Sequence, residues 1–288
     1  MMRHVTHPGP VAEDRLDLLP VEGKAIEVML RPGIPLEDAV AQAMADAGCD
    51  GGYLDFNAAP VSALEYVIPA HSSDADHVAW YSDIHSFDGA GVIDHMVMIV
   101  GTHDGKSFLH GHGRWTPEGG TTALGHILAP RTVLSEPVRA TGIGVTGGRF
   151  ERRHDPETNF DLFQTTGAGV RDADHALLRI RPNVDFDTAL GDACARLGWD
   201  AARAFGLGSL NETDFEDGSH LDSLPSEFLI LDAPVGQTVN RGPHIDIVGV
   251  DGGKLYRGYV ERGANPVLIT AEIVLKRMPV ADTTKAGS

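Results

Sequence analysis

The chain is poor in several residue types, and each shortage excludes a class of protein. It has only two cysteines, Cys49 and Cys194, in 288 residues, which are too few for a disulfide scaffold. Lysine and arginine total 23 against 41 acidic residues, so the formal net charge is −18. A chain this acidic repels phosphate, which disfavours nucleic acid as a partner but leaves room for a local basic patch.

Long apolar runs are also missing. No stretch approaches the roughly 20 apolar residues that a membrane-spanning helix needs. The N-terminal sequence is polar and rich in proline, and it lacks the apolar centre of a signal peptide. We therefore expect no membrane partner and a cytoplasmic location. The hydrophobic content of 42% is enough for two ordinary domain cores.

An internal repeat with a constant offset of 150 residues organises the sequence. Leu178–Asn183 matches Val28–Gly33, and each copy contains an Arg-Pro pair. Apolar residues then recur at three- and four-residue spacings, which predicts helices beginning near Leu36 and Phe186, each closed by a glycine. The arginines of the two Arg-Pro pairs could hold an anionic substrate, but their presence in both copies favours a structural role.

Strand-like segments follow each predicted helix, so we expect an α+β fold. It would consist of two homologous units, each a mainly antiparallel β-sheet packed with one or two helices. The predicted boundaries are an N-terminal arm (1–21), a first unit (22–146), a linker (147–174), a second unit (175–279) and a C-terminal tail (280–288).

The stretch Phe108–His126 carries the clearest chemical signal. His110 and His112 stand two residues apart, a spacing that on a β-strand directs both imidazoles to one face. A Pro-Glu-Gly-Gly turn follows, and His126 then lies on the expected returning strand. Three imidazoles suit a borderline-soft divalent metal, with zinc as the candidate. The alternative is that they are buried, hydrogen-bonded histidines that stabilise a hairpin.

The second copy keeps this hairpin but not its histidines. At the three corresponding positions it carries His244, Asp246 and Tyr259. Because the fold does not require the triad, the histidines of the first copy are expected to serve chemistry or binding. The prediction is one site per chain, in the first unit.

Together these elements resemble the plants-and-prokaryotes-conserved (PPC) domain family, in a tandem arrangement over about residues 22–145 and 175–278. The family's signature has a His-x-His strand, an acidic-Gly turn, a Gly-His-Leu-like return and a Thr-x-Glu strand. Here it is carried by His110-Gly-His112, Pro117-Glu-Gly-Gly120, Gly125-His126-Ile127 and a weaker Ser135-Glu136, with Thr270-Ala-Glu272-Ile273 in the second copy.

The resemblance implies a homotrimer with sites near subunit contacts. It also implies a three-histidine metal site, carried over to His110, His112 and His126 only. Plant members have a separate DNA-binding hook beside the domain, and many bacterial members are described as DNA-binding by family association. This chain lacks the hook, so DNA binding is a weak expectation here.

Four further residues are candidates for chemistry. Arg114 follows the triad strand and has no arginine counterpart in the second copy, so it could bind the negative charge of a substrate. Trp115 could wall the pocket. Glu136 and His85 are the acid–base candidates. Each has a plainer alternative: a solvated arginine, a packed tryptophan, a glutamate that matches Glu272 in a structural ion pair, and a surface histidine.

The sequence therefore predicts a small-molecule site in the first unit with a divalent metal. If the protein is an enzyme, the expected reaction is that of a lyase, hydratase or hydrolase acting on a small anionic substrate. The alternative is a non-enzymatic regulator, DNA-associated or protein-binding, and a third reading is a ligand-binding module without turnover.

Overall fold

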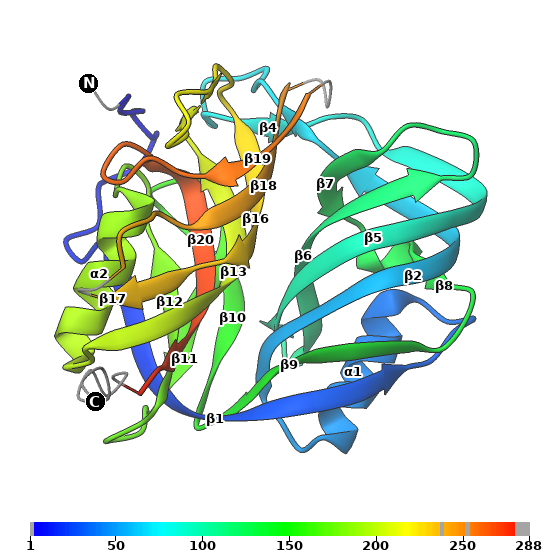
Figure 1. The fold of residues 1–288 in the computed structure, drawn as a ribbon, viewed down its shortest axis with the longest axis horizontal. Helices are drawn as coiled ribbons and strands as arrows, with labels where there is room; N and C mark the ends of the chain where they lie inside the picture. The colour runs from blue at the N-terminus through cyan, green and yellow to red at the C-terminus, as the bar shows by residue number, and fades with distance from the viewer. Residues whose placement is uncertain (1–2, 237–238, 251–253, 280–288) are drawn as a thin grey trace, which may run out of the picture.

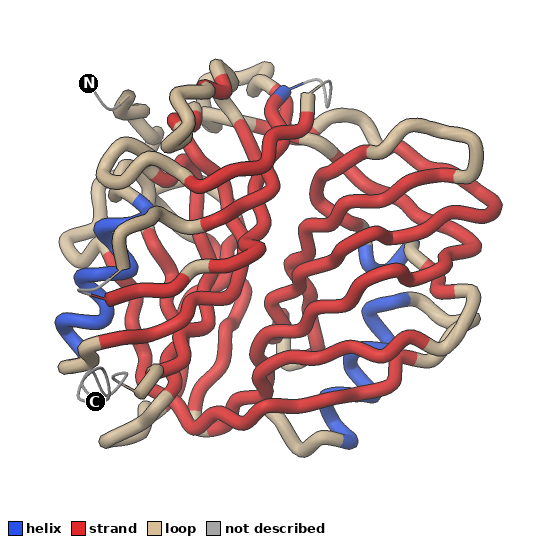
Figure 2. The backbone as a smooth tube through the Cα atoms, in the orientation of Figure 1, coloured by secondary structure: helices blue, strands red, loops and turns tan. Residues whose placement is uncertain are grey.

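The computed structural model describes residues 3–236, 239–250 and 254–279. Among these residues, 56% lie in strands and 10% in helices. Figures 1 and 2 show two facing groups of strands, each with one helix on its outer side. Within the described ranges, no helix is long and apolar enough to cross a membrane.

In the described part of the chain the α-helices are α1 (Leu36–Asp46) and α2 (Phe186–Leu197), and a 3₁₀ turn spans Ala129–Arg131. The strands in chain order are β1 (Leu16–Leu30), β2 (Gly51–Val67), β3 (Pro69–Ala70), β4 (Trp80–Tyr81), β5 (His85–His103), β6 (Lys106–Pro117), β7 (Ala123–Ile127), β8 (Val133–Leu134), β9 (Val138–Thr146), β10 (Gly148–His154), β11 (Asp161–Gly167), β12 (His175–Ile180), β13 (Ala201–Leu210), β14 (Thr213–Asp214), β15 (His220–Leu221), β16 (Ser226–Asp232), β17 (Pro234–Gly236), β18 (His244–Gly249), β19 (Leu255–Tyr259) and β20 (Val267–Arg277).

Strand β1 joins the two groups of strands. Its first part, Leu16–Val21, pairs with β12, and its second part, Glu22–Leu30, pairs with β9. From β9 the pairing continues through β2, β7, β6 and β5 to β10 and β11, and we call this group sheet 1. From β12 it continues through β20, β13, β16, β18 and β19, which we call sheet 2.

Each helix covers the outer face of one sheet. Leu36 and Val40 of α1 are buried in the core of sheet 1, and Phe186 and Leu190 of α2 are buried in the core of sheet 2. The helices begin at Leu36 and Phe186, so the prediction from the apolar spacing is confirmed. The Asp185 side chain caps α2 by accepting the Thr188 N–H at 2.8 Å, a contact that typically contributes about 1 kcal/mol.

A third core lies between the two sheets. It includes Val97 and Ile99 of β5, Leu207 of β13, Leu229 of β16 and Val248 of β18, all of them buried. Burying each such side chain contributes on the order of 2 kcal/mol, which holds the inner faces of the sheets together. The two halves of the chain therefore meet over an extended apolar surface.

The expected α+β class is wrong, because the structure is mostly β and its described part contains only two α-helices. The physical reason is the way the sheets are covered. Sheet 1 and sheet 2 bury their inner faces against each other, so one helix on each outer face is enough. In addition, the segment 147–174, which the sequence presents as a linker, contains β10 and β11, which extend sheet 1.

Candidate metal centre

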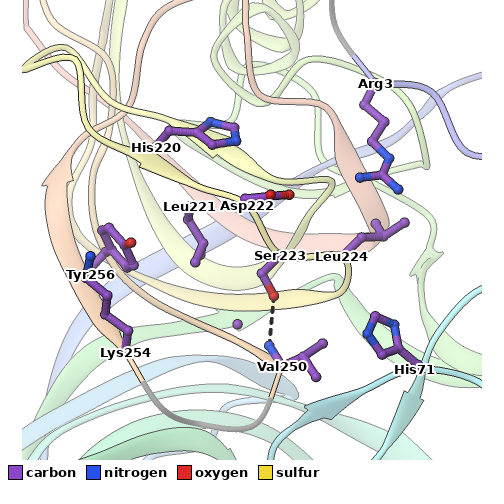
Figure 3. Close-up of a pocket in the computed structure, with 11 residues that line it drawn as sticks. Arg3, His71, His220, Leu221, Asp222, Ser223, Leu224, Val250, Lys254 and Tyr256 are labelled. Carbon is purple, nitrogen blue, oxygen red and sulfur yellow. Dashed lines mark hydrogen bonds between the residues drawn. The ribbon is translucent and has the colours of Figure 1, made fainter.

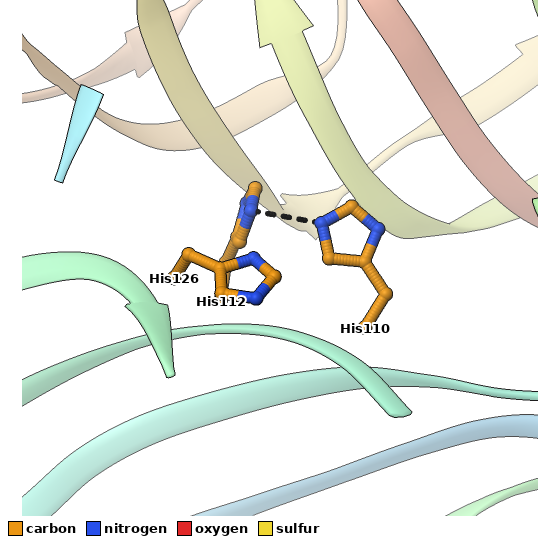
Figure 4. A group of neighbouring side chains, drawn as sticks. All are labelled: His110, His112 and His126. Carbon is orange, nitrogen blue, oxygen red and sulfur yellow. Dashed lines mark hydrogen bonds between the residues drawn. The ribbon is translucent and has the colours of Figure 1, made fainter. Parts of the chain in front are cut away.

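The β6–β7 hairpin brings three histidines together on the inner face of sheet 1. His110 and His112 alternate with glycines along β6, and His126 on β7 lies directly across from His112. One ring nitrogen from each histidine lies within 4.8 Å of those of the other two. Figure 4 shows the three rings converging.

Hydrogen bonds fix the tautomers of two of these rings. His110 Nδ1 lies 2.6 Å from Glu272 Oε2, and His112 Nδ1 lies 2.8 Å from the Phe228 carbonyl oxygen. Because a carbonyl or carboxylate oxygen accepts, both Nδ1 atoms carry the proton and donate it. In the neutral form of each ring, Nε2 is then left with a lone pair.

The two Nε2 atoms, of His110 and His112, lie only 3.2 Å apart. Two lone pairs at that distance repel each other unless a proton or a cation lies between them. A tetrahedral zinc ion with bonds of 2.0–2.1 Å to nitrogen has ligand–ligand edges of about 3.3 Å. The spacing and the donor set therefore fit such an ion.

Burial keeps the imidazoles of His112 and His126 in the neutral form that a metal requires. Burial, reinforced by the charges of the neighbouring histidines, lowers the pKa of His112 well below its usual value. Burial together with the neighbouring His110 lowers the pKa of His126 to about 3. The buried His126 Nδ1 has no hydrogen-bond partner among the described residues, so one of its ring nitrogens is free for a ligand.

Two glutamates of sheet 2, Glu272 and Glu227, lie beside the histidine triad. The sequence did not predict that either would contact a histidine of the triad. Glu272 is fully buried, and Oε1 of Glu227 lies 3.7 Å from His112 Nε2. Burial raises the pKa of Glu227 to about 8. Both residues stand next to runs of apolar residues in β20 and β16, and a carboxylate at such a buried position is the signal that could have identified them.

The other predicted site residues are not gathered at the triad. Arg114 lies two residues beyond His112, and its Nη1 donates to Asp246 Oδ2 at 3.0 Å. Trp115 is fully buried in the core of sheet 1. Glu136 and His85 are exposed, and neither lines the cavity beside the triad. Their proposed roles remain predictions.

Strand pairing changes the match between the two hairpins. His244 faces Tyr259 across β18 and β19, as His112 faces His126 across β6 and β7. His244 therefore corresponds to His112, and not to His110 as the comparison of the two hairpin sequences suggested.

Glu136 and Glu272, which the sequence comparison matched, do not stand at equivalent positions of the two halves. Glu272 pairs with Arg179 across β20 and β12. The position equivalent to Arg179 in the first half is Met29, which pairs with Arg139 across β1 and β9. Arg139 rather than Glu136 is thus the counterpart of Glu272.

A second group of metal-ligand side chains lies at the rim of sheet 2, where Glu212, His220 and Asp222 have ligand atoms within 4.8 Å of one another. His220 and Asp222 line an open hollow of about 740 Å³, drawn in Figure 3. Both are exposed, and His220 Nδ1 already lies 2.7 Å from Asp214 Oδ1. Solvent competes for exposed polar groups of this kind, so the buried triad is the better candidate site.

No family model and no curated protein sequence matches the chain. Among solved structures, a metal-containing protein from Archaeoglobus fulgidus aligns with 50% of this chain and 95% of its own length, at 18% identity and a TM-score of 0.38. A PPC protein from Pyrococcus horikoshii aligns with 54% of this chain and 97% of its own, at 15% identity and a TM-score of 0.37. A proposed DNA-binding protein from Bacteroides thetaiotaomicron covers 50% and 97%, at 12% identity and a TM-score of 0.37. TM-scores of this size do not assign a family or a function to this chain.

Proposed function

We propose that this chain binds one divalent metal ion, most suitably zinc, through His110, His112 and His126, and uses it on a small molecule. The observation that carries the proposal is the 3.2 Å separation of two Nε2 atoms whose rings both donate through Nδ1. When bound, such an ion polarises a carbonyl group or water. The reaction class that follows is that of a lyase, hydratase or hydrolase.

The chain's own residues prepare this site from both sheets. Glu272 and the Phe228 carbonyl orient the rings of His110 and His112 and make them better ligands, as outer hydrogen-bond partners of metal-bound histidines commonly do. Glu227 stands beside His112, within reach of a bound molecule, where its carboxyl group is placed to hold or release a proton.

We also propose that the chain consists of two related units, of which the second supports the metal site of the first. Helix α2 begins 150 residues after α1, and each half carries a hairpin with the same cross-strand pairing, β6–β7 and β18–β19. The second hairpin lacks the triad, but the strands β16 and β20 of the same half supply Glu227 and Glu272.

Metal analysis of protein purified without a histidine tag tests the proposal. We expect about one zinc per chain after reconstitution, and loss of that metal in His110→Ala and His112→Ala. The matched control is His154→Ala, whose side chain is 58% exposed on β10. Circular dichroism establishes that each variant is folded. Failure of the native chain to bind zinc, or full retention of zinc in both triad variants, would refute the metal site.

A further inference from the structure

A small cavity of about 60 Å³ lies beside the triad, between β6 and sheet 2. His110 and His112 form part of its wall. The rest is largely apolar and includes the following side chains: Pro69, Trp80, Tyr81, Phe160, Leu162 and Leu268. No lysine or arginine of the described residues lines it. Pockets for drug-sized ligands measure about 300–1,000 Å³, so this one fits a molecule of only a few non-hydrogen atoms.

Two buried side chains that line this cavity have unused hydrogen-bonding atoms. Glu227 Oε2 and Thr270 Oγ1 have no partner among the described residues. Glu227 is 6% exposed and Thr270 is 4% exposed, so bulk water does not satisfy them. A buried polar atom without a partner costs about 1–3 kcal/mol, which a bound molecule with complementary atoms would recover.

The positions of these two residues direct them to the triad. Thr270 lies two residues before Glu272 on β20, so both side chains point to the same face of sheet 2. Glu272 contacts His110, and Glu227 lies next to His112. A molecule that satisfies Glu227 and Thr270 is therefore held against the histidines.

We propose that Glu227 and Thr270 are the hydrogen-bonding partners of a small uncharged carbonyl or alcohol compound with a short apolar chain. The proposal rests on the proposed function in one respect, since the metal at the triad would act on the bound molecule. With the metal bound, the carboxylates of Glu227 and Glu272 balance the two positive charges of the ion. With or without the metal, no lysine or arginine of the described residues lines the cavity, so the negative charge of an anion would enter it uncompensated.

Ligand-observed NMR with propionamide and propionate tests this assignment, because the two probes have the same number of non-hydrogen atoms and differ in charge. We expect the metal-free protein to bind propionamide at least tenfold more tightly than propionate. Glu227→Leu and Thr270→Val should each weaken propionamide binding by about tenfold, the ratio that corresponds to one buried hydrogen bond. Leu162→Trp should abolish it by filling the cavity, whereas Glu261→Leu, at an exposed position, should have no effect.

Equal or tighter binding of propionate, or propionamide binding that survives Leu162→Trp and both polar substitutions, would overturn the assignment. Thr270→Val keeps the test decisive if Glu227→Leu does not fold. Zinc uptake on reconstitution, measured on separate aliquots of each variant, separates the two proposals. Zinc uptake without propionamide binding by the metal-free protein refutes the ligand assignment alone, and propionamide binding without zinc uptake refutes the metal site alone.

Discussion

Glu272 accepts a hydrogen bond of 2.6 Å from His110 Nδ1, although the two residues stand 162 positions apart in the sequence. The first lies on sheet 2 and the second on sheet 1, so the contact spans the boundary between the two halves of the chain. It fixes the tautomer of His110 and points its Nε2 lone pair toward His112. The candidate site is thus a property of the two halves together.

Glu272→Gln should weaken zinc binding by about tenfold or more, because an amide is a poorer acceptor for the His110 N–H than a carboxylate and makes the ring a weaker ligand. Competition against a fluorescent chelator measures this affinity. Glu261→Gln, at an exposed position, is the matched control and should leave the affinity unchanged. An affinity within twofold of the native value in Glu272→Gln would show that Glu272 does not support the metal.

The metal-free chain should lose stability as the pH falls below about 6.5. Burial lowers the pKa values of His7, His95, His112 and His126, the last to about 3. Between these values and the ordinary histidine pKa, the unfolded chain binds protons that the folded chain does not. These histidines lower the free energy of unfolding as the pH decreases, by up to about 1.4 kcal/mol per pH unit each. The buried Glu227, whose pKa is raised to about 8, acts in the opposite direction, but a single group offsets only part of the loss from four histidines below about pH 6.5.

Urea unfolding at pH 7.5, 6.5 and 5.5, with a chelator present, measures this effect. About 0.3 M salt screens the net charge of −18, whose self-repulsion also changes with pH. Stability that stays level or rises between pH 6.5 and 5.5 would contradict the prediction.

Asp155→Ala should reduce the free energy of unfolding by about 3–5 kcal/mol, because the buried Arg179 loses its closest partner and, among the described residues, keeps only Asp17, at 3.7 Å. Asp155 is fully buried, contacts the fully buried Arg179, and accepts from Arg181 Nη1 at 2.9 Å. Burial alone would raise the pKa of Asp155, but these arginines hold it below its usual value.

The matched control for Asp155→Ala is Glu27→Ala, which removes an exposed ion pair with Arg139. Both of its side chains are at least 60% exposed, so we expect a loss of less than about 1 kcal/mol. Denaturant unfolding measures both variants. Similar losses in the two would mean that the buried network adds no more than a surface pair.

Arg114→Met should lower stability by about 1–3 kcal/mol and leave zinc content unchanged. The variant loses the bond from Arg114 to Asp246, which joins sheet 1 to sheet 2. The loss stays moderate because Asp246 keeps its two bonds of 2.6 and 2.7 Å to Arg257. Thermal unfolding and metal analysis measure the two effects. Unchanged stability would instead support the role that the sequence suggested, the binding of an anionic substrate.

Duplex DNA should not bind, even at about 20 mM salt, because 41 acidic residues oppose 23 basic ones. Fluorescence anisotropy with a labelled 30-bp duplex measures this. A binding curve that weakens steeply as salt is added would reveal a basic surface strong enough to overcome the net charge, and would favour the regulator hypothesis.

The sequence by itself determined the local parts of this protein. The apolar spacing defined α1 and α2, and the two-residue spacing of His110 and His112 placed both rings on one face. These patterns are readable because the helical and strand periods are properties of neighbouring residues. The offset of 150 residues likewise marked the related segments of the two halves.

Only the tertiary structure decided which surfaces meet. Apolar inner faces attract one another without direction, so the strand pattern does not reveal that sheet 1 packs on sheet 2 rather than on further helices. This is why the α+β expectation failed and why the contact of Glu272 with His110 cannot be read from the sequence. The partners of His110 and His112, Glu272 and the Phe228 carbonyl, come from strands brought close only by that packing.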